Sequence, residues 1–256
     1  MSNMKKILDM TDSEIVDTIQ SGKLNICVIG IGRIGLPTAL SFANSGLPTI
    51  GVDINEKLVE MINSRNFPLN DEPGYDIIFD KVINENKFKA TTSFSEGVSS
   101  SDVIVLSLPT PMDEKNIPDY SSLLSIAKKL HDEISDGKLI IIESTVEPGF
   151  VENDFLKIIE GDDNKLKLGK NFALGVCPET ANPGQILNDF ERLPRLVGAM
   201  DEHTQNLITK IYKHVFTVEL IPMPNCKTAN AVKLTTNVFR DLNIAFVNEL
   251  ALIFEK

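Results

Sequence analysis

The chain holds few of the residues on which disulfide scaffolds and metal sites depend. Its 256 residues include only three cysteines and three histidines. Cys27, Cys177 and Cys226 are odd in number and far apart, which argues against a disulfide framework and against a metal cluster. The histidines follow no partnering motif, so we interpret all three as surface or core residues. No metal is expected.

Positive charge is also scarce. Lys and Arg number 25 against 36 Asp and Glu, which gives a net charge of −11. No basic patch offsets this charge, so we expect neither nucleic acid nor an anionic membrane as a partner. No apolar run reaches transmembrane length, and the N-terminus has no signal-peptide hydrophobic core. A cytoplasmic location is therefore expected.

From Leu24 onward, apolar strand-like runs alternate with helical periodicity. This alternation predicts an α/β fold, a Rossmann-type doubly wound parallel sheet covered by helices. The expected strands are 24–29, Leu47–Asp53, Phe88–Thr91, Asp102–Leu108, Lys138–Glu143, Phe172–Cys177, Arg195–Ala199 and Phe216–Leu220. The expected helices include Thr11–Gln20, with Asp12 or Ser13 as its cap, and the segments 55–64, 75–87, 120–135, 149–160 and 201–214.

The first expected strand runs into Gly30, Gly32 and Gly35, the spacing of the dinucleotide-binding fingerprint. In that motif the glycines allow a tight turn, a close approach of backbone amides to a pyrophosphate, and packing of the following helix on the sheet. The second strand ends at Asp53, where a carboxylate would accept hydrogen bonds from an adenosine ribose. With all elements in order, we favour nucleotide binding over a structural turn.

The last segment differs from the rest. After Pro222 and Pro224, no proline or glycine interrupts residues 225–256, so a continuous helix of roughly 48 Å is expected. It is apolar nearly all round in its second half. One face can pack on the sheet domain, and we expect the other to form a homodimer. The apolar positions are Val238, Leu242, Ala245, Phe246, Leu250 and Ile253.

Four further motifs lie where strand ends should meet a ligand. Three are the sequences 108–111 (LPTP), 144–149 (STVEPG) and 177–184 (CPETANPG). The fourth is Lys233, Asn237 and Arg240, which share one face of the final helix. Each has an ordinary structural explanation by itself, such as a helix cap or a solvated lysine. Together, after a dinucleotide fingerprint, they indicate a catalytic site.

In this motif set the chain, from about residue 24 to its end, resembles the UDP-glucose/GDP-mannose dehydrogenase family. These enzymes oxidise a nucleotide sugar at C6 to the acid with two NAD. The sequence 232–249 looks most like the UDP-N-acetylmannosamine dehydrogenase branch, because it holds the pair Arg240 and Asp241. The resemblance implies NAD as cofactor, a UDP-sugar substrate and a dimer built on the long helix.

The resemblance also implies roles for single residues. Thr110 and Thr145 would contact the nicotinamide half of NAD, and Arg33, Ile34 and Asp53 the rest. Glu179 would sit by the substrate and, with Thr145, place the hydrolytic water. In the last helix, Lys233 would act as acid/base or as a cation near the C6 oxygen, and Asn237 would help stabilise an oxyanion. Substrate contacts would also come from Thr180, Ala181 and Arg240, the last as a planar multidentate donor.

Two departures from the family qualify these expectations. Thr180 stands where the branch usually has arginine, which leaves the exact sugar open. The family's cysteine nucleophile and second, UDP-binding domain have no counterpart in these 256 residues. We therefore divide the chain into a helical extension (1–23), an NAD-binding Rossmann-type domain (24–221) and a long central helix (222–256), and expect further structure beyond it.

Two other functions stay open at this point. A two-electron β-hydroxyacid dehydrogenase would also combine a Rossmann domain with a helix bearing lysine and asparagine four residues apart, and it needs no cysteine. Thr145 in its motif and the Pro178-Glu179 pair argue against it. The chain could also be a non-catalytic fragment that binds NAD and dimerises.

Overall fold

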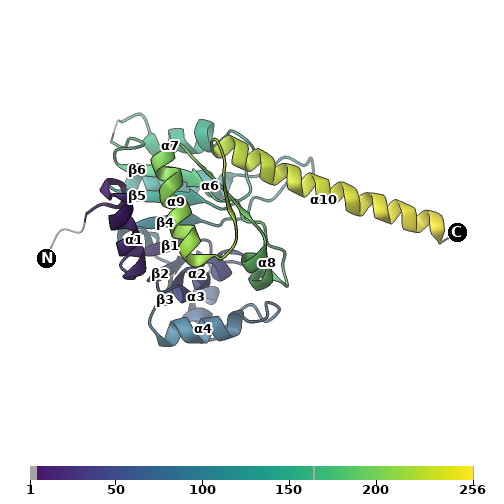
Figure 1. The fold of residues 1–256 in the computed structure, drawn as a ribbon, viewed down its shortest axis with the longest axis horizontal. Coiled ribbons are helices and arrows are strands. Elements are labelled where there is room, and N and C mark those ends of the chain that lie inside the picture. Colours follow the sequence, from purple (N-terminus) through teal and green to yellow (C-terminus); the bar gives the residue numbers. More distant parts are fainter. Residues whose placement is uncertain (1–4, 164, 256) are drawn as a thin grey trace.

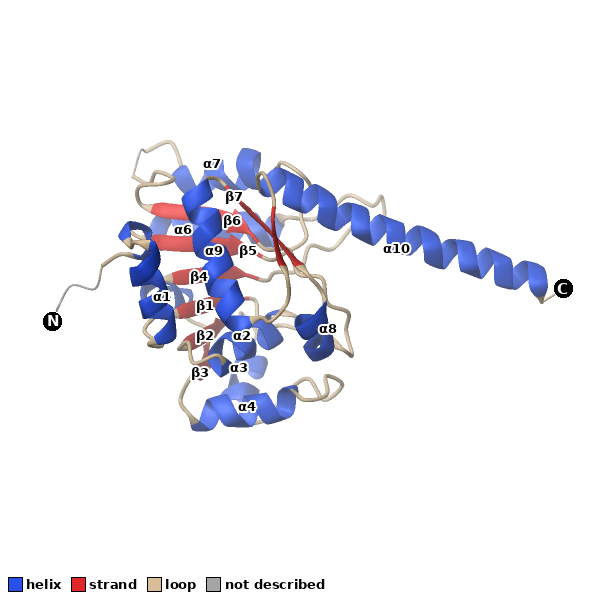
Figure 2. Cartoon of the chain, in the orientation of Figure 1, coloured by secondary structure: helices blue, strands red, loops and turns tan. Residues whose placement is uncertain are grey.

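The chain forms one eight-stranded sheet with helices on both faces, as a computed structural model that describes residues 5–163 and 165–255 shows (Figures 1 and 2). Residues 1–4 and 256, the ends of the predicted extension and last helix, lie outside the described part. The strand order is β3-β2-β1-β4-β5-β6-β7-β8. The strands are β1 (Ile26–Ile29), β2 (Thr49–Val52), β3 (Phe88–Thr91), β4 (Val103–Leu106), β5 (Lys138–Ile142), β6 (Phe172–Val176), β7 (Arg195–Ala199) and β8 (Leu220–Pro222).

Strands β1 to β6 are parallel and follow the order of a doubly wound dinucleotide-binding fold. The Rossmann-type prediction is therefore confirmed. The expectation of a wholly parallel sheet is wrong for the far edge, because β7 runs antiparallel to β6 and β8 is parallel to β7. The chain between β6 and β7 stays at the strands' carboxyl end, where it forms the short helix α8 (Ile186–Arg192), so β7 returns in the opposite direction.

The strands are buried on both faces, as their continuous apolar runs predict. In β1, Ile26 and Val28 belong to one hydrophobic cluster and Cys27 and Ile29 to the other. The helices that cover the sheet are α1 (Asp12–Gln20), α2 (Gly35–Asn44), α3 (Glu56–Asn63), α4 (Tyr75–Asn84), α5 (Phe94–Ser99), α6 (Ser121–Glu133), α7 (Leu156–Glu160, after a π turn Val151–Phe155) and α9 (Glu202–Val215). The first cluster includes side chains of α1, α2, α4, α8 and α9, and the second includes those of α5, α6 and α7.

Two local predictions are corrected. Thr11, not Asp12 or Ser13, caps α1, because Thr11 and Glu14 form a reciprocal capping box. The last strand lies at Leu220–Pro222 and not at Phe216–Leu220. Pro222 does not break this strand, because β8 is at the sheet edge and pairs only with β7 in the described chain.

The final helix α10 (Cys226–Phe254) leaves the body and projects outward (Figure 1). Its 29 residues span about 43 Å. Only its first turns are buried, through Cys226, Ala229, Asn230 and Lys233. The expectation that one face of the second half packs on the sheet domain is wrong, since residues 238–254 are exposed apart from half-buried Leu250. Within the described ranges, no helix has the length and apolar character to span a membrane.

Candidate active site

A cavity of about 1000 Å³ lies at the carboxyl ends of the central strands. This is the edge at which open α/β sheets bind their ligands. Every residue predicted to contact the cofactor lines it, as does one predicted substrate residue. These residues are Gly30, Gly32, Arg33, Ile34, Gly35, Asp53, Thr110, Thr145 and Glu179.

The glycine loop has no room for a side chain at Gly30 or Gly35 but is open at Gly32. Gly30 has a φ of +85°, and a Cβ on Gly35 would lie 1.8 Å from the carbonyl oxygen of Gly30. A Cβ on Gly32 would meet no atom within 4 Å and would instead stand in the cavity. The loop therefore presents bare backbone to a ligand, just before α2 begins at Gly35. An anionic ligand group fits there, because the positive end of the helix dipole faces it.

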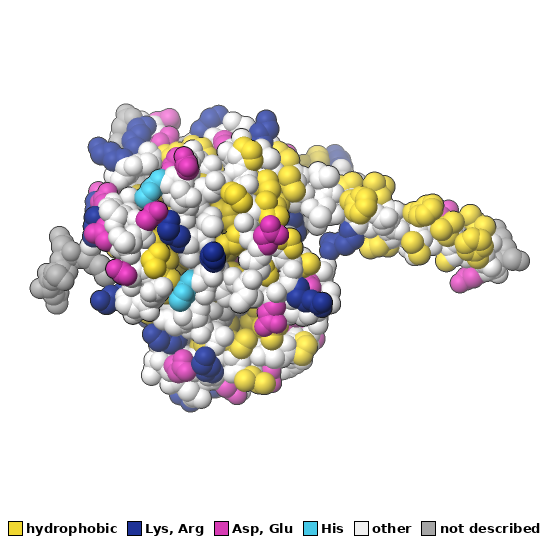
Figure 3. All heavy atoms as spheres, viewed as in Figure 1, with side chains coloured by type: hydrophobic (Ala, Val, Ile, Leu, Met, Phe, Trp, Pro, Cys, Tyr) yellow, Lys and Arg dark blue, Asp and Glu magenta, His cyan; other side chains and the backbone are white. Residues whose placement is uncertain are grey.

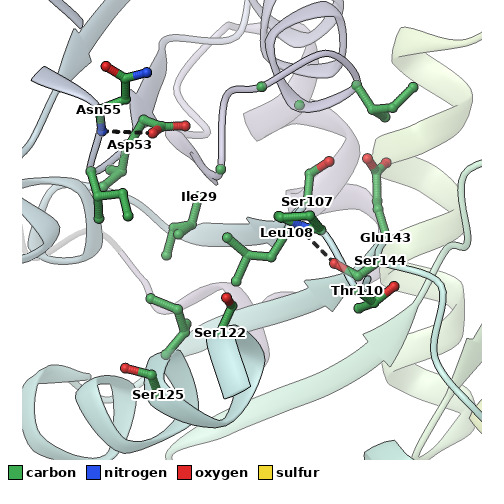
Figure 4. A pocket seen from close by; sticks show the side chains of 18 of the residues that line it. Ile29, Asp53, Asn55, Ser107, Leu108, Thr110, Ser122, Ser125, Glu143 and Ser144 are labelled. Atoms are coloured by element: carbon green, nitrogen blue, oxygen red, sulfur yellow. Dashed lines mark hydrogen bonds between the residues drawn. The ribbon is translucent and has the colours of Figure 1, made fainter. Parts of the chain in front are cut away.

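Asp53 lies at the end of β2, at one end of the cavity (Figure 4). Its carboxylate accepts hydrogen bonds from the backbone N–H of Ile31 at 3.0 Å and of Asn55 at 2.9 Å. These bonds hold the side chain beside the glycine loop. A carboxylate has about four acceptor positions, so it can still accept bonds from ribose hydroxyls.

The other end of the cavity is formed by the loops that follow β4 and β5 (Figure 4). The hydroxyl of Ser144 accepts a bond from the N–H of Leu108 at 2.9 Å, and Thr110 donates to the carbonyl of Thr145 at 2.9 Å. The two predicted threonines thus lie together and are fixed by bonds between the loops.

Glu143, a residue that the sequence motifs do not indicate, is a buried carboxylate that lines the cavity at the end of β5. It accepts bonds from Arg195 on β7 at 3.1 Å, from the Tyr212 hydroxyl on α9 at 2.8 Å and from Thr38 on α2 at 3.1 Å. Burial would lower the pKa of Arg195, but the Glu143 carboxylate raises it above its ordinary value. Two features of the sequence could have indicated this pair. One is a charged residue directly after a run of apolar strand residues, and the other is Arg195 at the start of another strand.

Arg195 is also enclosed by aromatic rings. Its guanidinium carbon lies 4.3 Å from the ring centroid of Phe190 and 4.0 Å from that of Phe216. Its Nη2 has no hydrogen-bond partner among the described residues. The aromatic faces provide the remaining electrostatic stabilisation for this buried cation.

The predicted substrate residues gather around the loop that follows β6. Burial lowers the pKa of Lys233, and the carboxylate of Glu179 raises it again. Burial likewise raises the pKa of Glu179, whose carboxylate accepts a bond from the N–H of Ala181. This electrostatic effect acts without an ion pair or hydrogen bond between Glu179 and Lys233 among the described residues.

The rest of the predicted substrate group lies beside this pair. Arg240 donates to the side-chain oxygen of Asn182 at 2.6 Å, which ties α10 to the same loop. Thr180 and Ala181 are half-buried in that loop, and Asn237 is half-buried on α10. None of these residues, nor Lys233, lines the large cavity itself.

Comparison with known proteins shows the family to which this site belongs. Residues 24–216 match the model of the UDP-glucose/GDP-mannose dehydrogenase family, NAD binding domain. This match covers most of the chain. The chain belongs to the UDP-glucose/GDP-mannose dehydrogenase family. Its cofactor is NAD, and the open backbone at Gly32 and the position of Asp53 fit that group.

Individual relatives agree with the family match. A UDP-N-acetyl-D-mannosamine dehydrogenase of Campylobacter jejuni is 35% identical over 238 residues, covering 90% of this chain and 57% of the relative. The protein CapL of Staphylococcus aureus is 34% identical over 236 residues, covering 91% and 53%. The structure of a UDP-D-ManNAc dehydrogenase from Pyrococcus horikoshii superposes with a TM-score of 0.83 at 34% identity, covering 90% and 54%. The chain thus spans about half the length of these relatives.

Two matched substitutions separate the structural glycine from the binding glycine. Gly35→Ala should lower the free energy of unfolding by about 3 kcal/mol, because the new methyl group overlaps the backbone of Gly30. Gly32→Ala should leave stability within about 0.5 kcal/mol and raise the Kd for NAD about tenfold or more. Urea unfolding and calorimetric titration measure the two effects, and the reverse pattern would contradict this assignment.

The buried Glu143–Arg195 pair should be costly to break. Arg195→Met should destabilise the fold by about 3–5 kcal/mol, because it leaves Glu143 as an uncompensated buried charge. The double variant Glu143→Gln/Arg195→Met, which removes both charges, should recover a large part of that loss. Denaturant unfolding of both variants tests this, and a single variant within about 1 kcal/mol of the wild type would rule it out.

Proposed function

We propose that the chain is the NAD-binding part of a nucleotide-sugar 6-dehydrogenase, acting on UDP-N-acetylmannosamine to give the uronate for polysaccharide biosynthesis. One observation carries the proposal: Lys233 is buried in the first turns of α10, and Arg240 of the same helix bonds to the loop that carries Glu179, which lines the NAD cavity. Relatives named as UDP-N-acetyl-D-mannosamine dehydrogenases, such as that of Campylobacter jejuni, support this choice of sugar.

Bound NAD supplies the acceptor for the hydride that leaves the alcohol carbon. Lys233 takes the proton of the C6 hydroxyl, a role that burial favours because it lowers the pKa of the amine. Once protonated, its ammonium stabilises negative charge that develops on the oxygen. Glu179 and Thr145 position the water that enters for the second oxidation.

The polar face of α10 provides the remaining substrate contacts in this proposal. Asn237 lies one helical turn beyond Lys233 and serves as an amide donor to the oxyanion. Arg240, held at Asn182, offers a planar donor to the sugar or phosphate. Thr180 and Ala181 lie in the same loop. Thr180 is shorter than the arginine that the UDP-N-acetylmannosamine dehydrogenase branch usually has there, so it leaves more space beside the substrate.

The three cysteines of the chain do not serve as the family's nucleophile. Cys27, Cys177 and Cys226 are buried. Burial raises the pKa of all three thiols, that of Cys177 to about 12, so the reactive thiolate is not formed at neutral pH. The covalent step of the second oxidation therefore needs a cysteine from outside residues 1–256.

The cytoplasmic location and the homodimer are part of the same proposal. NAD and a UDP-sugar are metabolites of the cytoplasm, which supports the first. The second is supported by the apolar strip on α10, where Leu242, Phe246 and Ile253 are 65%, 61% and 63% exposed (Figure 3). Two copies related by a two-fold axis would bury the same residues of each helix.

Asp53 should select NAD over NADP. Its charge repels a 2′-phosphate, and its free acceptor positions suit the ribose hydroxyls. Asp53→Asn keeps an acceptor oxygen for the N–H of Ile31, so the fold should persist while NAD binding weakens by about 1–3 kcal/mol. Calorimetric titration with both cofactors decides this, and NADP binding as tight as NAD binding in the wild type would refute it.

The proposed activity can be tested in a hybrid that adds the half of a relative that residues 1–256 do not span. Residues 1–256 alone should bind NAD and form no uronate from UDP-N-acetylmannosamine. Joined after α10 to the remainder of the Campylobacter jejuni relative, they should release two NADH for each sugar. Lys233→Met in this hybrid should slow the reaction about 100- to 10,000-fold without weakening NAD binding.

The outcome of these assays distinguishes the three candidate functions. One NADH per molecule from a β-hydroxyacid would favour the two-electron dehydrogenase. NAD binding with no activity in the hybrid would favour the non-catalytic fragment. Uronate and two NADH from residues 1–256 alone would contradict the cysteine argument.

The dimer should depend on the apolar strip of α10. Phe246→Glu should convert a dimer of residues 1–256 into a monomer, because it buries a charge in the proposed interface, and it should leave NAD binding intact. Asn248→Glu adds the same charge at a polar position and serves as the matched control. Light scattering measures the state, and a monomeric wild type with a stable α10 would refute the dimer.

A further inference from the structure

A buried carboxylate outside the roles described so far lies between the cofactor cavity and the loop that carries Glu179. It is Glu72, in the connection between α3 and α4, and its side chain is fully buried. One of its oxygens accepts a bond from the N–H of Gly184 at 2.6 Å, and the other accepts one from the N–H of Ile186 at 3.2 Å. Glu72 thus holds the end of the loop 177–185 and the first residue of α8.

The same carboxylate pairs with the cation of the glycine loop. Arg33 Nη2 lies 3.2 Å from Glu72 and also pairs with Asp71, a carboxylate on the surface. The side chain of Arg33 is 43% exposed and lines the NAD cavity. One buried group therefore contacts both the loop that meets the cofactor and the loop that carries Glu179.

Other contacts make the loop dependent on this anchor. Glu179 accepts the N–H of Ala181, and Asn182 donates through its N–H to Asp189 on α8 at 2.8 Å. On the opposite side, a Cβ on Gly74 would lie 2.6 Å from the Leu187 side chain, so the Glu72 segment packs directly on α8. The segment around Glu72 and the loop before α8 are tightly packed, so a change in the position of Glu72 moves the loop.

We propose that Glu72 couples the two half-sites, so that NAD bound at Arg33 orders the loop 177–185 and with it Glu179. The assignment of that loop to the sugar rests on the function proposed above, whereas the coupling itself does not. The guanidinium of Arg33 has five N–H donors, and its described contacts use only Nη2. It can therefore bind a pyrophosphate oxygen without releasing Glu72.

The direction of the coupling follows from the restraint that a bound anion places on Arg33. An anionic pyrophosphate restrains Arg33, and a restrained Arg33 strengthens the charge-assisted contact with Glu72. The coupling is reciprocal, so a weakened Glu72 anchor also weakens NAD binding by the same factor. Asp71 contributes little, because its side chain is 60% exposed and its contact with Arg33 is screened by water.

Hydrogen exchange of the amides of Gly184 and Ile186 tests the coupling without any enzymatic activity. Mass spectrometry of a peptide covering residues 178–187 should show exchange slowed by NAD about fivefold or more in the wild type. Glu72→Gln should abolish this effect and raise the Kd for NAD by the same factor. Arg33→Met should abolish it too and raise the Kd by more, because it also removes the proposed contact with the pyrophosphate. Asp71→Asn, the matched control, removes a neighbouring charge that touches no loop amide, and it should retain the effect.

Three outcomes would overturn the proposal. NAD that binds the wild type without changing the exchange of this peptide refutes the coupling and leaves the cofactor site intact. An effect retained in Arg33→Met, confirmed as folded by its unfolding curve, refutes the route through Glu72. If Asp71→Asn abolishes the slowing of exchange by NAD as fully as Glu72→Gln does, the effect comes from general surface charge and not from the Glu72 anchor. Failure of the hybrid to oxidise UDP-N-acetylmannosamine would count against the proposed function and would leave the coupling unaffected.

Discussion

The buried carboxylate of Glu143 holds the two parts of the sheet together beneath the cavity. It is placed at the end of β5 and accepts bonds from Thr38 on α2, Arg195 on β7 and Tyr212 on α9. The first partner belongs to the dinucleotide-binding half, and the other two belong to the antiparallel extension. A buried charge is tolerated only when it is paired and hydrogen-bonded, so these four residues must be present together.

This constraint explains where the functional residues lie. The strand β7 starts at Arg195 and passes under the beginning of α10, where Gly198 contacts Asn225 and Ala229 so closely that no Cβ fits. The position of β7 thus sets the position of α10, which carries the buried Lys233 and bonds through Arg240 to the loop that carries Glu179. The cofactor loops come from the parallel half and the lysine from the extension, so the proposed reaction takes place at their junction.

The parallel half could be predicted from the sequence because its signals are local. Buried strands read as apolar runs, and the fingerprint from Gly30 to Gly35 with Asp53 fixes the cofactor end. The antiparallel direction of β7 could not be predicted, since it depends on the path of the chain through α8. Glu143, Arg195 and Glu72 were missed because their partners are distant in sequence. The outward course of α10 was missed because an apolar helix does not reveal which surface will cover it.

A crystal structure of the chain with bound NAD tests the central claim most directly. The account predicts the pyrophosphate on the glycine loop beside Gly32, the adenosine ribose on Asp53, and the nicotinamide near Thr110 and Thr145, toward Glu179 and Lys233. The fold, with the Glu143–Arg195 pair intact, should be unchanged. A cofactor bound in the reverse direction, or outside this cavity, would contradict the account.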